Sequence, residues 1–300
     1  MTPVWMLRHG AFSPVSSEKQ GGTPSRFTLW GVVNVTPDSF YDGGRHAEKS
    51  RALSHALTLA GEGARILDFG GASSRPGAED VPAKEELSRV MPVLREACLL
   101  RASGEDAFRE RLFSVDTWRA AVAKEALEAG ADIVNDISAC AWEPELREVV
   151  ASCRPGYVLM HCLPGARPGS MQKAPHYGNV TDEVLAFFEE GMKKLVGDGL
   201  PEEHIMLDPG IGFGKTAEHN SALLCDMERL LALGRPVLLG VSQKSLFGDI
   251  LGLDVAHRGE ATNVCTALLA ARGVRHHRVH DVASARRALT LADRFTPWGD

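Results

Sequence analysis

The chain has 300 residues, of which 44% are hydrophobic and 24% are charged, a composition typical of a folded globular protein and not of a disordered chain. Its formal net charge of -6 gives no electrostatic reason to expect nucleic acid or an anionic membrane as a partner. The six cysteines are scattered, without the short Cys/His spacing that zinc needs, so we expect reduced structural thiols.

Residues 1–26 are rich in Ser, Pro and Gly and show no sustained period. We interpret them as an N-terminal extension outside a main domain of residues 27–300. The beginning of the chain has no long apolar stretch, and no apolar run of about 18 residues follows later. We therefore expect neither secretion nor membrane spanning, and a cytoplasmic location.

From residue 29 onward, short apolar runs alternate with longer amphipathic segments, which is the sequence form of repeated βαβ units. The predicted strands are residues 29–34, 64–70, 111–116, 131–135, 156–161, 203–208, 236–241 and 275–280. The predicted helices lie near residues 47–62, 83–102, 118–129, 143–152, 181–198, 217–233, 258–272 and 282–294. Eight such units favour a closed (β/α)₈ barrel, a TIM barrel, with an open doubly wound sheet as the alternative.

A polar residue stands at or just beyond the carboxyl end of every predicted strand. These residues are Asn34, Asp68, Asp116, Asn135, His161, Asp208, Lys244 and His280. A parallel barrel gathers its strand ends on one face, where barrel enzymes place their sites. Any one of these residues could simply cap a helix or bind a loop amide. All eight together indicate a functional site.

Three of these side chains suit a flat, nitrogen-rich heterocycle. Asp116, Asn135 and Asp208 can accept and donate hydrogen bonds in one plane, and a carboxylate facing an amino-pyrimidine edge can accept two N–H bonds. Because an unmatched buried edge weakens binding strongly, these groups predict selectivity for such a ring.

Cationic side chains predict a phosphate site on the other side of the ring. Arg278 and His280 lie two residues apart on one strand, hence on one face, and Arg75 adds a second guanidinium within SSRPGA. Asn34 offers a neutral oxygen that suits Mg²⁺ held mainly by substrate phosphates and water.

The sequence contains no motif for nucleotide binding by a P-loop or for hydrolysis by an activated serine or by zinc. The stretch DPGIGFGKT has Pro209 where a P-loop needs its first glycine. The sequence also lacks G-x-S-x-G and H-E-x-x-H, so neither an activated serine nor a zinc-bound water is indicated.

The chain resembles a known family over residues 29 to about 295. It contains, in order, GVVNVTPDSFYDGG, ARILDFGGASSRPGA, SVDTWR, IVNDIS, YVLMH, PGSMQKAP, MLDPGIGFGK, VSQKS and RVHDV. This set is similar to that of the dihydropteroate synthases, barrel enzymes of folate biosynthesis. The resemblance implies a Mg²⁺-dependent condensation of 6-hydroxymethyl-7,8-dihydropterin diphosphate with 4-aminobenzoate, which yields 7,8-dihydropteroate and diphosphate. It also implies a homodimer.

The resemblance further implies roles for individual residues. Those implied to bind the pterin are Asp116, Asn135, Met160, Asp208, Phe213, Lys244 and Arg278. Those implied to bind the diphosphate are Asn34, Ser74, Arg75, Arg278 and His280, with Asn34 as the metal ligand. Those implied to bind aminobenzoate are Phe40, Ser74, Pro76 and Ser242. The catalytic set implied is Asn34, Arg75, Lys244, Arg278 and His280.

The chain departs from the family pattern at three positions. Ser74 replaces the common Thr and keeps the hydroxyl, so we expect little change. Ala72 stands in place of Glu and Gln243 in place of Arg, which removes one charge of each sign. We expect this joint loss to alter loop ordering and sulfonamide inhibition while turnover persists. The alternatives are a pterin-binding methyltransferase and a catalytically silent paralogue that only binds pterin.

Overall fold

The structure is a computed structural model, and it describes residues 3–12, 19–20, 23–35, 44–72, 80–163, 167 and 175–296. The short N-terminal strands are β1 Trp5–Leu7, β2 Gly10–Phe12, β3 Lys19–Gln20 and β4 Thr23–Pro24. The barrel strands are β5 Thr28–Asn34, β6 Ile66–Gly70, β7 Leu112–Asp116, β8 Ile133–Asp136, β9 Gly156–Met160, β10 Ile205–Asp208, β11 Leu238–Leu239 and β12 His276–Val279. The helices are α1 Gly44–Glu62, α2 Ala83–Ala102, α3 Ala120–Ala129, α4 Leu146–Cys153, α5 Val180–Gly197, α6 Ala217–Cys225, α7 Met227–Leu231, α8 Leu246–Leu251, α9 Gly259–Ala271 and α10 Val282–Phe295. Two 3₁₀ turns, η2 Glu202–His204 and η3 Val255–His257, complete the described elements.

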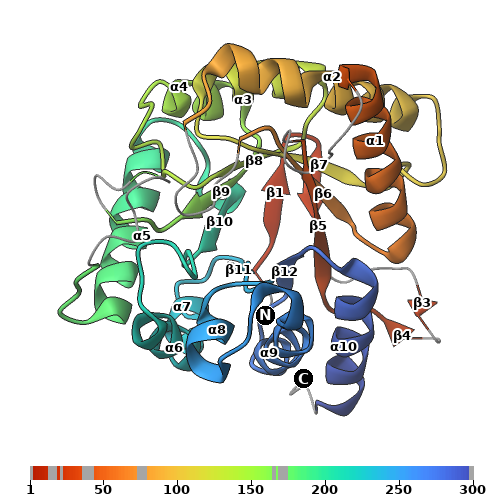
Figure 1. The fold of residues 1–300 in the computed structure, drawn as a ribbon. Coiled ribbons are helices and arrows are strands. Elements are labelled where there is room, and N and C mark those ends of the chain that lie inside the picture. Colours follow the sequence, from red (N-terminus) through yellow and green to blue (C-terminus); the bar gives the residue numbers. More distant parts are fainter. Residues whose placement is uncertain are drawn as a thin grey trace.

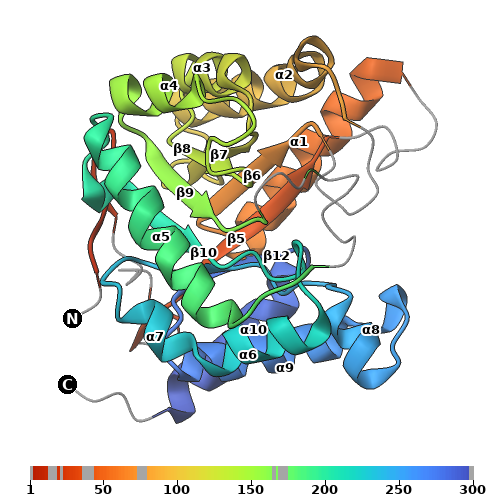
Figure 2. The same cartoon turned by 90° about the vertical axis from the view of Figure 1, so that its left-hand side faces the viewer.

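The strands form one parallel sheet that curls into a barrel. Its order is β10-β9-β8-β7-β6-β5-β12-β11, and every neighbouring pair is parallel. The last gap is bridged where the Leu207 N–H donates to the Pro236 carbonyl at 2.9 Å and Leu207 pairs with Val237. In Figure 1 the helices surround the strands, and Figure 2 shows the same barrel after a turn of 90°. The predicted (β/α)₈ barrel is therefore confirmed.

Local sequence signals explain where several helices begin. The Asn179 side chain accepts hydrogen bonds from the backbone N–H groups of Thr181 and Asp182, which caps α5. Thr216 caps α6 in a reciprocal arrangement with His219. Each cap satisfies backbone donors that the first helical turn leaves unpaired.

Two helical features differ from the sequence-based prediction. The predicted helix over residues 217–233 is divided at Asp226 into α6 and α7. The helix α8 has only six residues and was not predicted, because a segment of that length carries less than two turns of apolar periodicity. Within the part of the chain that the structure describes, no helix combines the length and apolar character needed to cross a membrane.

Part of the segment predicted to lie outside the barrel packs against its amino-terminal end. Strands β1 and β2 form an antiparallel hairpin, and β1 crosses the middle of the ring in Figure 1. Trp5 is fully buried, stacks on Trp30 with ring centroids 5.8 Å apart, and donates its indole N–H to the His204 carbonyl at 2.8 Å. A Cβ at Gly156 would lie 2.6 Å from the Trp5 ring, so only glycine permits this contact. The hairpin closes the barrel floor.

The barrel interior changes from apolar to polar along the strands. At the floor, Trp30 and Ile66 pack with Trp5 in one buried cluster. Because side chains alternate between the two faces of a strand, the next inward residue of β6 is Asp68. The same alternation on β12 places Arg278 two residues after His276. The polar layer lies next to the carboxyl ends of the strands.

Candidate active site

A guanidinium joins two carboxylates in the polar layer. Arg278 Nε donates to Asp68 Oδ2 at 2.6 Å, and Arg278 Nη2 donates to Asp116 Oδ2 at 2.7 Å. The Asn135 amide also donates to Asp68 Oδ2, at 3.0 Å. Four strands, β6, β7, β8 and β12, thus hold one hydrogen-bonded polar cluster. Asp68 is buried completely, and its other oxygen accepts no hydrogen bond from the described residues.

Burial sets the electrostatics of this cluster. It raises the pKa of Asp116 to about 7, against the opposing attraction of Arg278 and with the help of the Asp68 charge. Burial alone would lower the pKa of Arg278, but the charges of Asp68 and Asp116 outweigh it and raise that pKa above its ordinary value. Arg278 is therefore a fixed cation, while burial makes the Asp116 carboxyl hold its proton more tightly than a free aspartate does.

Asp208 and Asn135 extend the cluster around the ring. Asp208 ends β10 in register with Met160 of β9, and its Oδ1 accepts the Gly210 N–H at 2.7 Å. Burial raises the pKa of Asp208, whereas this hydrogen bond lowers it. Asn135 of β8 lies in register with Asp116 of β7. The three side chains predicted to face a heterocycle therefore come from β7, β8 and β10, at the same end of the barrel.

An apolar wall adjoins these polar groups. Its buried members are Ala72, Trp118, Ile137, Met160, Cys162 and Phe213. Sequence reasoning selected Met160 and Phe213 but missed Trp118, Ile137 and Cys162. Alternation could have found two of them, because Ile137 follows Asn135 by two residues and Cys162 follows Met160 by two. No local signal identified Trp118.

Lys244 and Phe213 meet at the wall. The Lys244 ammonium nitrogen lies 4.1 Å from the centroid of the Phe213 ring, which is the geometry of a cation–π contact. Gly212 permits this approach, since a Cβ there would lie 3.1 Å from Lys244 Cδ, and its φ of +80° favours glycine. The two residues belong to the loops after β11 and β10.

The predicted division into an acidic and a cationic side holds only in part. Arg278 lies between the carboxylates of Asp68 and Asp116 instead of facing them from across the ring. His280 pairs with Ser242, whose Oγ lies 2.9 Å from His280 Nδ1 and also accepts the His280 backbone N–H at 3.3 Å. The strand alternation that placed Arg278 and His280 on one face could not specify these partners.

Asn34 ends β5 close to the carboxylate cluster. Gly70 separates it from Asp116: a Cβ on Gly70 would lie 3.7 Å from Asp116 Oδ2 and 3.9 Å from Asn34 Oδ1. The described residues contain no group of three or more His, Cys, Asp or Glu side chains that could hold a metal. A single neutral oxygen fits Mg²⁺ only in the way predicted, with substrate phosphates and water supplying most ligands.

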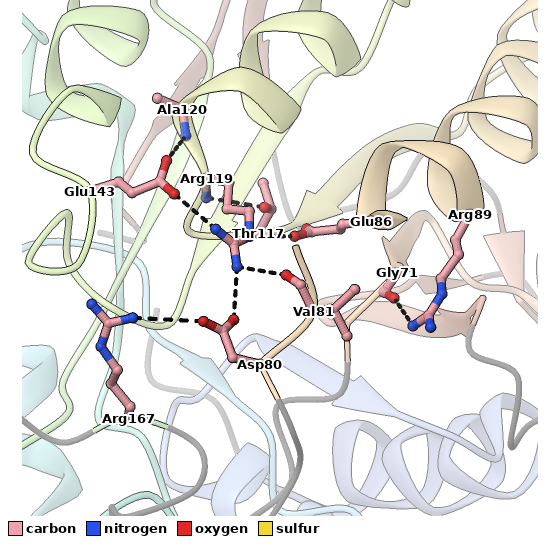
Figure 3. Close-up of polar contacts among 10 residues, drawn as sticks. All are labelled: Gly71, Asp80, Val81, Glu86, Arg89, Thr117, Arg119, Ala120, Glu143 and Arg167. Atoms are coloured by element: carbon pink, nitrogen blue, oxygen red, sulfur yellow. Dashed lines mark hydrogen bonds and ion pairs between the residues drawn. The ribbon is translucent and has the colours of Figure 1, made fainter. Parts of the chain in front are cut away.

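A second charged network, centred on Arg119, joins three loops at the rim (Figure 3). Arg119 Nη2 contacts Asp80 Oδ1 at 2.7 Å and the Val81 carbonyl at 2.6 Å, and Arg119 Nη1 contacts Glu143 Oε1 at 3.0 Å. Its Nε lies 3.2 Å from Oε2 of Glu86, a fully buried carboxylate. Burial raises the pKa of Glu86 to about 7. Sequence reasoning did not select this network.

Ala72 and Gln243, the two positions where the chain lacks a charged residue of the family pattern, lie in different surroundings. Ala72 is buried in the apolar wall. Gln243 has a φ of +62°, and its backbone N–H donates to Thr262 Oγ1 while its carbonyl accepts from Arg258 Nη1. A non-glycine residue in this left-handed conformation stores strain of about 1 kcal/mol or more beside Lys244. Four predicted site residues lie outside the described residues: Phe40, Ser74, Arg75 and Pro76.

Comparison with known proteins agrees with this geometry. A family model described as pterin binding enzyme matches residues 30–280. The dihydropteroate synthase of Synechocystis sp. is 41% identical over 274 residues, which span 89% of this chain and 90% of that protein. The dihydropteroate synthase of Mycobacterium leprae is 42% identical over 269 residues, covering 87% and 90%.

Solved structures give the same result. A Xanthomonas albilineans dihydropteroate synthase with 4-aminobenzoic acid superposes with a TM-score of 0.81 at 41% identity, covering 91% of this chain and 94% of that one. The same enzyme in complex with 7,8-dihydropteroate gives a TM-score of 0.77 at 38% identity, with 91% and 95% covered.

The barrel, the polar cluster and the family match define a pterin-binding enzyme. Sequence identity of about 40% to dihydropteroate synthases, along most of both chains, then identifies the family within this class. The chain belongs to the dihydropteroate synthase family.

Proposed function

We propose that the chain condenses 6-hydroxymethyl-7,8-dihydropterin diphosphate with 4-aminobenzoate, releasing diphosphate and 7,8-dihydropteroate for folate biosynthesis. The observation that carries this proposal is the gathering of Asp116, Asn135 and Asp208 at one end of the barrel, beside an apolar wall. Relatives in this family have been solved with 4-aminobenzoic acid and with 7,8-dihydropteroate bound. Folate synthesis is the process to which such a product belongs.

The pterin would bind between the polar cluster and the wall. Asp116 and Asp208 accept hydrogen bonds from the amino-pyrimidine edge, and Asn135 can both donate and accept. Met160 and Phe213 pack against the ring faces, which excludes water and strengthens the polar contacts. Buried partners of this kind penalise any ring that cannot match them, so the site selects a pterin.

Arg278 and Lys244 provide the positive charge near the ring. Arg278 already contacts both Asp68 and Asp116, so a neutral pterin can enter without leaving either buried carboxylate without a charged partner. Arg278 covers one ring face in this proposal. Lys244, which lies over Phe213, donates to a ring acceptor.

The diphosphate would bind at the strand ends beyond the ring. We assign it to Asn34, Ser74, Arg75, Arg278 and His280. Asn34 supplies an oxygen ligand for Mg²⁺, which when bound neutralises charge on the departing diphosphate. Guanidinium groups contribute bidentate hydrogen bonds to phosphate oxygens.

The aminobenzoate would bind beside the leaving group, against Phe40, Ser74, Pro76 and Ser242. The Ser242 hydroxyl is already oriented by His280, at 2.9 Å from Nδ1. In the reaction the bond between the pterin methylene carbon and the diphosphate oxygen breaks, and both electrons leave with the diphosphate. The electron-rich dihydropterin stabilises the methylene cation, and the neutral arylamine attacks it and loses a proton. No covalent enzyme intermediate is required.

We also propose a homodimer formed through α8, α9 and α10. Exposed large apolar side chains occur on these helices and on η3, between α8 and α9: Ile250, Leu251, Val255, Val264, Leu268, Leu291 and Phe295. The pairs on α9 and α10 are each spaced four residues apart, so each pair shares one helix face. Exposed apolar side chains that share helix faces are typical of an interface between subunits. A cytoplasmic location accords with six cysteines that are all unpaired.

One assay tests the proposed activity. Purified protein is mixed with the pterin diphosphate, 4-aminobenzoate and Mg²⁺, and dihydropteroate and diphosphate are quantified. We expect both products in equal amounts, loss of turnover on chelation of Mg²⁺, and recovery when Mg²⁺ is restored. Pterin binding without product would indicate a silent paralogue. The variant Asp208→Asn should lose most activity, while Asp198→Asn, at the solvent-exposed C-terminal end of α5, should retain it.

A further inference from the structure

A buried lysine lies directly behind the apolar wall. Lys215 belongs to the loop between β10 and α6 and is only 4% exposed. Its Nζ lies 2.8 Å from His161 Nδ1 and 3.1 Å from each of the carbonyl oxygens of Gly210 and Phe213. A fourth acceptor, the His161 carbonyl, lies at 3.4 Å. The function proposed above assigns no role to this residue.

The number of donors matches the number of near acceptors. An ammonium group has three N–H donors and no acceptor, and three acceptors lie within 3.1 Å of Lys215 Nζ. The loop carbonyls of Gly210 and Phe213 are thereby tied to the end of β9 through His161. Burial lowers the pKa of Lys215 to about 7, opposed by Cys162 and Asp208 and reinforced by Lys244.

The His161 ring is suited to accept this bond. Burial and the neighbouring Lys215 charge lower the pKa of His161 to about 2, so the ring stays neutral and one nitrogen carries a lone pair. Its other neighbours are aromatic: Phe187 lies edge-on with ring centroids 4.8 Å apart, and Tyr177 lies at 6.0 Å. The ring cannot turn away without losing this packing.

The glycines of this loop do not by themselves fix its path. Gly210, Gly212 and Gly214 all have positive φ, between 60° and 80°. Glycines of this kind permit the loop conformation but do not enforce it, because glycine has the largest backbone freedom of any residue. A Cβ on Gly210 would lie 2.1 Å from the His161 carbonyl oxygen, so the loop passes against β9 as closely as a backbone can.

Lys215 determines where this loop presents Phe213. The Gly210 carbonyl accepts both the Lys215 ammonium and the Phe213 backbone N–H, the latter at 3.0 Å. The Phe213 carbonyl accepts from Lys215 as well. The ammonium therefore holds the Phe213 carbonyl directly and the Phe213 N–H through the Gly210 carbonyl, and Phe213 in turn lies under Lys244.

We infer that Lys215 is a positioning residue for pterin binding, acting through the placement of Phe213 and hence of Lys244. The inference rests on the proposed function, because it takes the pterin to lie against Phe213. Lys215 does not touch the substrate. Together with Asn220, which accepts the Gly212 N–H, and Tyr177, which donates to the Gly214 carbonyl, it restrains a loop that contains three glycines.

The test measures pterin and aminobenzoate binding separately. Lys215→Met keeps an unbranched apolar side chain, one atom shorter than lysine, and removes all three donors. We expect the Kd for 6-hydroxymethyl-7,8-dihydropterin diphosphate, by calorimetry, to rise roughly 10- to 100-fold, since small misplacements of a binding group have effects of that size. The KM for 4-aminobenzoate should change less than about twofold. Lys194→Met, the same change on the exposed face of α5, is the control and should leave both values unchanged.

A double-mutant cycle shows whether the effect passes through Phe213. Phe213→Leu alone should weaken pterin binding, and Lys215→Met added to it should weaken binding by much less than it does in the wild-type background. Fully multiplicative losses would overturn the inference. So would unchanged pterin affinity in a folded Lys215→Met protein. If Lys215→Met fails to fold, Lys215→Gln, which keeps two donors, decides by the same measurements. Wild-type protein that binds no pterin diphosphate would instead contradict the proposed function.

Discussion

Arg278 and Asp68 face each other inside the barrel from two strands that flank β5, with Nε and Oδ2 2.6 Å apart. Asp68 is fully buried, so the pair is shielded from solvent and from screening by salt. Replacing one member of a buried pair leaves the other charge unpaired, which destabilises proteins by about 3 to 5 kcal/mol.

We therefore expect Arg278→Met, which leaves both Asp68 and Asp116 without their shared cation, to lower the free energy of unfolding by about 3 kcal/mol, measured by urea denaturation at pH 7. Ser114→Ala is the matched control, because Ser114 lies in register with Asp68 and its hydroxyl has no hydrogen-bond partner among the described residues. It should change stability by less than about 1 kcal/mol. Equal effects of the two substitutions on the free energy of unfolding would show that the charge pair stabilises the fold no more than an uncharged polar side chain does.

The second prediction concerns pH and Glu86. Its pKa is raised by burial from 4.5 to about 7, so the folded state holds this proton more tightly than the unfolded state does. The stabilisation is fully present below about pH 4.5 and is lost as pH rises through about 7. A tenfold change in an ionisation constant corresponds to about 1.4 kcal/mol, so the loss is on the order of 3 kcal/mol.

Glu86→Gln should flatten this part of the stability profile and make the protein more stable than wild type at pH 8. Urea denaturation at half-unit steps between pH 4 and pH 8 measures the slope. Glu85→Gln, at the adjacent exposed position, should leave the slope as it is in wild type. A Glu86→Gln profile as steep as that of wild type would show that another group titrates.

The third prediction concerns Arg119, the cation that faces Glu86 at the rim (Figure 3). Arg119→Met leaves three carboxylates, Asp80, Glu86 and Glu143, without their shared partner. We expect a loss of about 3 kcal/mol at pH 8, where Glu86 is ionised, and a smaller loss at pH 5. The double variant Arg119→Met/Glu86→Gln should recover more than half of the loss at pH 8. If the double variant recovers no stability, the loss arises from Asp80 and Glu143 and not from Glu86.

The fourth prediction tests the N-terminal hairpin. Trp5→Ala removes a fully buried indole and its hydrogen bond to the His204 carbonyl, and should lower stability by about 4 kcal/mol. Val4→Ala, one residue earlier and 57% exposed, should change stability by less than about 0.5 kcal/mol. Thermal unfolding of both variants measures the difference, and a stable Trp5→Ala protein would show that the barrel needs no closed floor.

The fifth prediction tests the proposed dimer. Leu268→Glu places a charge on the apolar face of α9 and should convert the dimer to a monomer in sedimentation velocity experiments. Leu99→Glu, at a similarly exposed leucine on α2, should leave the assembly state unchanged. Monomeric wild-type protein at micromolar concentration would contradict the proposal.

The sequence by itself determined the succession of barrel elements and the end of the barrel that carries the site. Buried parallel strands read as short apolar runs, so the periodic pattern marked all eight of them. Strand direction and alternation then brought Asp116, Asn135 and Asp208 together, because the carboxyl ends of parallel strands converge. The ordered motifs identified the family, which the comparisons confirmed.

Only the tertiary structure decided which of these residues contact each other. Arg278 pairs with Asp68 and Asp116, which lie 210 and 162 positions earlier in the chain, and no local pattern encodes a contact over that distance. Trp5 shows no periodic signal, yet it fills the floor because an open barrel end leaves apolar side chains without packing. In the sequence, Lys215 is only one residue of a glycine-rich loop. Its proposed role follows from the folded structure, which places acceptors from His161 and from the loop carbonyls around its ammonium group.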